Sequence, residues 1–199
     1  GALYAAIRDN VRLVVIDLDN QDDSQLIFET LNARGTPLLA ADLVKNLLLQ
    51  EATDTGANAE DLYARYWRRF DEDTDYWRAV IGRGLAQRPR IEVFLQHYLT
   101  LMTREEVPAA HLYAAYRDYS GSPDSGSPVD RLASIDHYAT IYRRLDGAGE
   151  SPQVQLFLER LSTMDVGTAY PLLLEVFNRL ESEPEELTCL LYTSDAADE

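Results

Sequence analysis

Two short helical patterns, joined by an Arg-Gly turn within residues 27–46, carry six side chains that could form a polar site. In the first pattern an aromatic and an amide side chain stand four residues apart, so they share one helix face. In the second, an aspartate and an asparagine have the same spacing, with a lysine beside the asparagine. The six residues are Phe28, Asn32, Arg34, Asp42, Lys45 and Asn46. Amide and charged groups held this way can orient a ligand through hydrogen bonds.

The same spacing also has a purely structural explanation, and spacing alone favours it. Asn32 can cap the turn, Asp42 can pair with Lys45, and Phe28 can be a core residue. In the functional interpretation, Asn32 and Asp42 orient a bound nucleotide or the residues that hold it. The secondary structure expected around these residues helps to decide between the structural and the functional interpretation.

A strand is expected ahead of the two helices. VRLVVIDLD, residues 11–19, is rich in β-branched residues and apolar at both odd and even positions, as is typical of a strand covered on both faces. One buried strand cannot satisfy its own backbone N–H and C=O groups. We therefore expect its sheet partners to lie ahead of Gly1, outside this sequence.

Helix signals flank the polar residues on both sides. Ser24 and the aspartates before it can cap the first helix, and Gly35 suits the left-handed position at its end. Thr36 and Pro37 can start the second helix, which has leucines four residues apart from Leu39 onward. One strand and two helices would thus position the polar site within residues 1–50.

The remaining chain, residues 51–188, is expected to be helical. Residues 51–60 and the arginine-bearing stretch GRGLAQRPR are predicted to be irregular, and SGSPDSGSP, residues 120–128, a flexible loop. Further helices are expected near 129–146, 152–163 and 168–182. The clearest helical face is formed by Ile91, Phe94, Leu95, Tyr98, Leu99 and Met102. The predicted fold class is therefore mainly α.

Composition excludes several functions. The 199-residue chain has a formal net charge of −16, which repels a phosphate backbone unless a local basic patch offsets it. No apolar run approaches the length of a membrane span, so we expect a cytoplasmic protein without membrane contact. The three histidines lack metal-site spacing, and no nucleophilic triad is present, so no metal ligand or catalytic residue is assigned.

The last eleven residues, CLLYTSDAADE, differ from the rest of the chain. They have no basic residue and no helical period, and they resemble a translated sequencing adapter. In that case residues 189–199, with the single cysteine, Cys189, are an artefact, and the charge is three units less negative. The alternative is a frayed acidic tail.

An arginine run offers a second candidate site. Its members are Arg65, Arg68, Arg69, Arg78, Arg83, Arg88 and Arg90, and they alternate with Tyr66, Trp67 and Trp77. Cations with aromatic faces between them can bind a nucleic acid strand, so Arg83, Arg88 and Arg90 are candidate DNA contacts. In the alternative interpretation, which is the favoured one, Asp71, Glu72, Asp73 and Asp75 stand among the arginines and neutralise most of the run.

Two stretches together carry a family resemblance. FETLNARG followed by DLVKN resembles the Phe-x-x-x-Asn region of the GmrSD-type restriction endonuclease family, and the likeness continues through RPRIEVFLQHYLTL and TAYPLLL. It covers nearly all of residues 1–188. The resemblance implies that residues 1–50 end a ParB/sulfiredoxin-like α+β nucleotide-handling domain, and that Phe28 and Asn32 belong to its nucleotide pocket. Roles for Arg34, Asp42, Lys45 and Asn46 follow only from their position beside that motif.

The resemblance also implies an activity and partners. Intact members are nucleotide-dependent DNA endonucleases that restrict foreign or modified DNA, using a nucleoside triphosphate with a divalent metal. The family's upstream Asp-Gly-Gln-Gln-Arg motif and downstream His-Asn-His nuclease motif are absent from this sequence. We therefore expect a fragment, inactive alone, whose partners are DNA, the missing N-terminal half of its domain and a nuclease domain. The alternative is a non-enzymatic helical scaffold or protein-interaction domain.

Overall fold

The computed structural model describes residues 39–82, 84, 87–146, 151–164, 167–180, 186 and 189–190. The chain divides between Pro37 and Leu38, and every described residue belongs to the second unit. The predicted strand over 11–19 and the first helix of the polar segment lie outside the described residues. The domain boundary at residue 50 and the adapter interpretation of residues 189–199 stay predictions.

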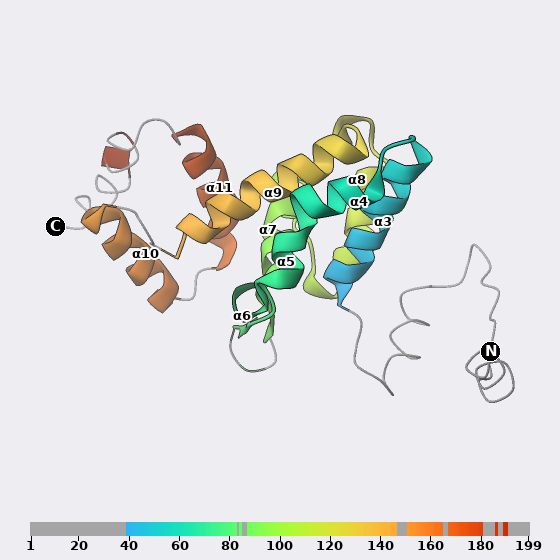
Figure 1. The fold of residues 1–199 in the computed structure, drawn as a ribbon. Helices are drawn as coiled ribbons and strands as arrows, with labels where there is room; N and C mark the ends of the chain where they lie inside the picture. Colours follow the sequence, from blue (N-terminus) through green and yellow to red (C-terminus); the bar gives the residue numbers. More distant parts are fainter. Residues whose placement is uncertain are drawn as a thin grey trace, which may run out of the picture. The chain divides into compact units, whose positions relative to one another are not determined.

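Helix α3, Ala40–Asp54, is the first described element (Figure 1). Its inner face consists of Ala41, Val44, Leu48 and Ala52, all fully buried. The expectation that residues 51–54 belong to a loop is wrong, because Ala52 packs in the core and extends the helix by one turn. The Ala40 N–H donates to a Glu92 carboxylate oxygen at 2.7 Å, which fixes the start of α3.

A series of short helices follows. They are α4 (Ala59–Leu62), a π-helical turn (Tyr63–Trp67), α5 (Arg68–Glu72) and α6 (Thr74–Trp77). Asn58 caps α4 by accepting hydrogen bonds from two backbone N–H groups. Trp67, Phe70 and Trp77 bring three large aromatic side chains into the core.

A small hairpin was not predicted from the sequence. Strands β1, Val80–Ile81, and β2, Arg88–Pro89, pair in antiparallel register, with Ile81 opposite Arg88. Two-residue strands are too short to leave an alternating pattern in the sequence, so the stretch reads as an irregular connection. The hairpin matters because it places Arg88 beside the next helix.

The longer helices confirm the mainly α fold class. They are α7 (Arg90–Thr103), α8 (Leu112–Ser120), α9 (Pro128–Arg144), α10 (Pro152–Met164) and α11 (Tyr170–Arg179). Five of the six residues predicted for the apolar face of α7 are fully buried. Helix α9 begins with a capping box formed by Ser127 and Asp130.

The core lies where α7 contacts α8, α9 and α11, and α3 packs against α7, α8 and α9 (Figure 1). Its centre is a chain of aromatic rings. Trp77 lies 4.8 Å from Phe70 and 5.5 Å from Phe94 between ring centroids, and Phe94 lies 5.3 Å from Tyr142. No described helix combines the length and the apolar character that crossing a bilayer requires.

Candidate functional site

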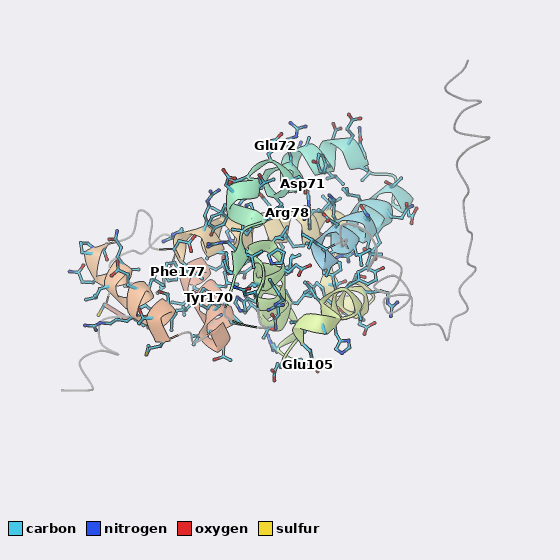
Figure 2. The ribbon with its side chains drawn as sticks, turned by 90° about the horizontal axis from the view of Figure 1, so that it is seen from below. Asp71, Glu72, Arg78, Glu105, Tyr170 and Phe177 are labelled. Carbon is cyan, nitrogen blue, oxygen red and sulfur yellow. The ribbon has the colours of Figure 1, made fainter. Side chains whose placement is uncertain are left out.

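Four charged side chains, from α3, α5 and the residue after α6, meet beside the start of α3. Lys45 Nζ lies 2.9 Å from an Asp71 carboxylate oxygen and 3.4 Å from Asp42. Arg78, which follows α6, donates from Nη2 to Asp42 at 2.9 Å and to Asp71 at 2.8 Å. Figure 2 shows Asp71 and Arg78 close together. We call Asp42, Lys45, Asp71 and Arg78 the α3 charge cluster.

Two cations and two carboxylates balance within the α3 charge cluster. The four side chains are between 19% and 25% exposed, so they are partly shielded from water. Burial would raise the pKa of Asp42, but the hydrogen bonds and charges of Arg78 and Lys45 outweigh it and hold the pKa below its ordinary value. Tyr63 also donates to Asp71, at 3.2 Å.

The α3 charge cluster is therefore suited to fixing a helix. Each carboxylate has two cationic partners, and each cation two carboxylates, which leaves no free charge for a ligand. The ion pair between Asp42 and Lys45 that the structural explanation requires is present. Among the described residues, no group of three or more His, Cys, Asp or Glu side chains could hold a metal ion.

Of the other predicted pocket residues, the structure describes Asn46. Phe28, Asn32 and Arg34 lie outside the described residues. Asn46 is exposed on α3 and does not join the charge cluster. Among the three described members of the predicted set, the structure thus brings Asp42 and Lys45 together, and Asn46 lies apart from them.

Of the three candidate DNA contacts, the structure describes Arg88 and Arg90, and both side chains have partners within the chain. Arg83 lies outside the described residues. Arg90 Nη1 lies 3.0 Å from Asp146, and its guanidinium stacks over the Tyr76 ring at 4.3 Å. Arg88 is half-buried, donates to Gln96 at 2.6 Å and lines a cavity.

Most other arginines of the run have acidic partners. Arg69 pairs with Asp136 of α9, and Arg68 lies near Glu72. Among the acidic residues of the run, Asp73 pairs with Arg143 of α9. Of the four carboxylates in the alternative interpretation, Asp71 and Glu72 thus pair with arginines of the run. DNA contact stays a prediction.

Replacing Arg78 by glutamine should cost about 1–2 kcal/mol of unfolding free energy at pH 7, between the values for exposed and buried ion pairs. The pKa of Asp42 is lowered in the folded protein, so its contribution is fully present above its unfolded pKa and is lost as pH falls through the lower folded value. The difference between wild type and Arg78→Gln should thus shrink below about pH 4.

Urea unfolding at pH 7 and at several lower values measures this effect. The matched control is Arg65→Gln, because Arg65 is exposed and only overlies the Tyr66 ring. The control should change stability by less than about 0.5 kcal/mol. A difference between wild type and Arg78→Gln that stayed constant down to pH 2 would contradict the assigned role of Asp42.

Comparison with known proteins supports one relationship. Residues 2–49 match the family model described as GmrSD restriction endonuclease, N-terminal domain. This match confirms the resemblance that FETLNARG and DLVKN carry, and it relates the chain to GmrSD-type restriction endonucleases through that segment. Neither the curated proteins nor the solved structures gave a match. The likeness seen in the sequence beyond residue 49 stays a prediction.

Proposed function

We propose that this chain is part of a cytoplasmic, nucleotide-dependent DNA endonuclease of the GmrSD type, which restricts foreign or modified DNA in defence against phage. The match over residues 2–49 to the N-terminal domain of GmrSD restriction endonuclease is the observation that carries the proposal. The Asp-Gly-Gln-Gln-Arg and His-Asn-His motifs would come from other parts of the protein. The chain alone should therefore neither hydrolyse nucleotide nor cut DNA.

Helix α3 could couple a change in the matched segment, residues 2–49, to the helices that follow it. The family match ends at residue 49, so it includes most of α3. The same helix packs within the second unit, residues 38–199, which we call the helical unit. Its buried inner face and the α3 charge cluster hold it there. A rearrangement of the matched segment that displaced α3 would have to break these contacts, so the helical unit would respond to it.

The individual pocket residues have either a direct or an indirect role in this proposal. In this proposal Phe28, Asn32 and Arg34 contact or orient a nucleoside triphosphate and its divalent metal. Asp42 and Lys45 support the pocket indirectly, because their charges are already balanced by Asp71 and Arg78. Asn46, whose side chain is exposed on α3, is proposed to contact or orient the nucleotide as well.

Changing Asn32 to alanine in the full-length protein should reduce nucleoside triphosphate hydrolysis by roughly a hundredfold or more, as for other lost orienting groups in active sites. The matched control is Gln50→Ala, which truncates an exposed amide on α3 beyond the family match. Steady-state phosphate release measures both variants, and circular dichroism checks their folding. Wild-type turnover in Asn32→Ala would remove this residue from the pocket.

The gene's flanking sequence discriminates this proposal from a non-enzymatic scaffold. An endonuclease requires the Asp-Gly-Gln-Gln-Arg motif before the matched segment and a His-Asn-His motif after the helical unit. If neither motif is encoded there, the helices build only an interaction surface, and the scaffold interpretation is favoured.

A further inference from the structure

A cavity of about 930 Å³ lies between α7, the β1–β2 hairpin and the start of α11, with α9 and α10 contributing to its wall. Glu105 and Tyr170, both labelled in Figure 2, line it. The size suits a small organic molecule, for which pockets of roughly 300–1,000 Å³ are typical. Neither the α3 charge cluster nor any proposed nucleotide-pocket residue takes part in it.

The cavity wall carries the positive charge of Arg88, which has no carboxylate partner among the described residues. Arg88 Nη2 donates to Gln96 at 2.6 Å, and the Gln96 amide in turn donates to the Val107 carbonyl at 2.6 Å, so the guanidinium is held in place. Its Nη1 is buried and has no hydrogen-bond partner among the described residues. A guanidinium nitrogen that is buried with an unused N–H donor is costly unless an acceptor pairs with it, and an anion would also balance the charge.

A neutral imidazole lies next to this cation. His97 Nδ1 is also buried without a partner among the described residues. Burial and the nearby charge of Arg88 lower the pKa of His97 to about 4, so the ring is uncharged at neutral pH. The ring stacks on Tyr170 at 5.1 Å between centroids. His97 can therefore donate or accept one hydrogen bond without adding charge.

The walls and the rim of the cavity indicate how apolar and how charged its ligand should be. Its walls are largely apolar, with Val93, Leu161, Pro171 and the ring of Tyr142. The exposed residues Arg104, Glu105 and Glu106 stand at the rim and carry both signs of charge. One inner cation within apolar walls fits a ligand with one anionic group and an apolar body better than a highly charged ligand.

We propose that this cavity binds a small organic anion, whose carboxylate or phosphate monoester group accepts a hydrogen bond from Arg88 Nη1 and whose apolar body lies against Tyr142 and Leu161. The proposal does not depend on the proposed endonuclease function. Arg88 thereby has a role different from the DNA contact expected from the sequence.

Isothermal titration of the 199-residue chain tests the proposal with four probes. Phenylacetate and phenyl phosphate carry both parts of the expected ligand, and their comparison distinguishes a carboxylate ligand from a phosphate monoester. Benzyl alcohol lacks the charge, and inorganic phosphate lacks the apolar body. At least one aromatic anion should bind more than about tenfold more tightly than benzyl alcohol and inorganic phosphate, because only it uses both the cation and the apolar walls.

Two variants connect the binding to this cavity. Arg88→Gln should weaken binding of the aromatic anion by roughly tenfold to a hundredfold, which is the effect of losing a hydrogen bond between charged groups. Ser162→Trp keeps Arg88 but places a bulky ring at an exposed lining position, and it should also weaken binding. The matched control is Arg117→Gln on α8, because Arg117 is exposed and does not line the cavity.

Three outcomes would overturn the proposal. The first is that no aromatic anion binds the wild-type chain at millimolar concentration. The second is that Arg88→Gln and Ser162→Trp, each folded by circular dichroism, bind as tightly as Arg117→Gln. The third is that inorganic phosphate binds as tightly as phenyl phosphate and phenylacetate does not bind, which would reduce the site to a simple anion site.

Discussion

A Trp77→Ala variant is expected to lose about 3–5 kcal/mol of unfolding free energy, the range for removing a large buried aromatic side chain. Trp77 is fully buried at the end of α6. Its ring contacts Phe70 of α5, Phe94 of α7 and Tyr142 of α9, with centroids 4.8 to 6.3 Å apart. Removing it would leave a cavity where three helices meet, and neighbouring rings can fill such a space only in part.

Guanidinium unfolding followed by circular dichroism measures this loss. The matched control is Leu172→Ala, because Leu172 is 67% exposed on α11 and should change stability by less than about 0.5 kcal/mol. If Trp77→Ala lost no more than this control, the aromatic chain would not be the centre of the core. The short helices from Ala59 to Trp77 would then contribute little to the fold.

An Arg131→Ala variant is expected to lose about 3 kcal/mol, near the lower end of the range for breaking a buried ion pair, because Glu51 keeps some contact with water. The Arg131 side chain is only 4% exposed on α9 and pairs with Glu51 of α3. It also donates from Nη1 to the Gly126 carbonyl at 2.8 Å and to the Ser125 hydroxyl at 3.1 Å. One arginine thus connects α9, α3 and the loop before α9.

A second substitution shows how much of the stability lost in Arg131→Ala comes from the ion pair with Glu51. Because Arg131→Ala leaves the Glu51 carboxylate without its partner, adding Glu51→Gln should restore part of the stability. Arg179→Ala is the matched control, since Arg179 pairs with Glu175 on the exposed surface of α11 and should cost less than about 1 kcal/mol. An equal loss in Arg131→Ala and Arg179→Ala would show that burial adds nothing to the Arg131 contacts.

Local patterns predicted most of the described helices. The apolar period of α7, for example, specifies that helix within a few neighbouring residues. The end of α3 was misjudged because the polar residues of EATD suggest a loop, and only the burial of Ala52 against other helices shows that it continues. The β1–β2 hairpin depends on tertiary contacts and leaves no local signal.

The candidate sites depended more heavily on long-range contacts. Asp42 and Lys45 were predicted as neighbours, but Arg78 lies 36 residues from Asp42 in the sequence, and no spacing rule connects them. The cavity around Arg88 joins residues of β1, β2, α7, α9, α10 and α11, so it could not be predicted from any single motif. The arginine spacing indicated a basic surface, whereas the folded chain pairs Arg69, Arg78 and Arg90 with carboxylates.

The most direct test of the proposed function is DNA cleavage by the full-length protein, with and without a nucleoside triphosphate and Mg²⁺. We predict that DNA is cut only when a hydrolysable triphosphate is present, and that Asn32→Ala loses both hydrolysis and cleavage while Gln50→Ala keeps both. Cleavage at the same rate without nucleotide, or hydrolysis without any cleavage of foreign or modified DNA, would contradict the proposed function.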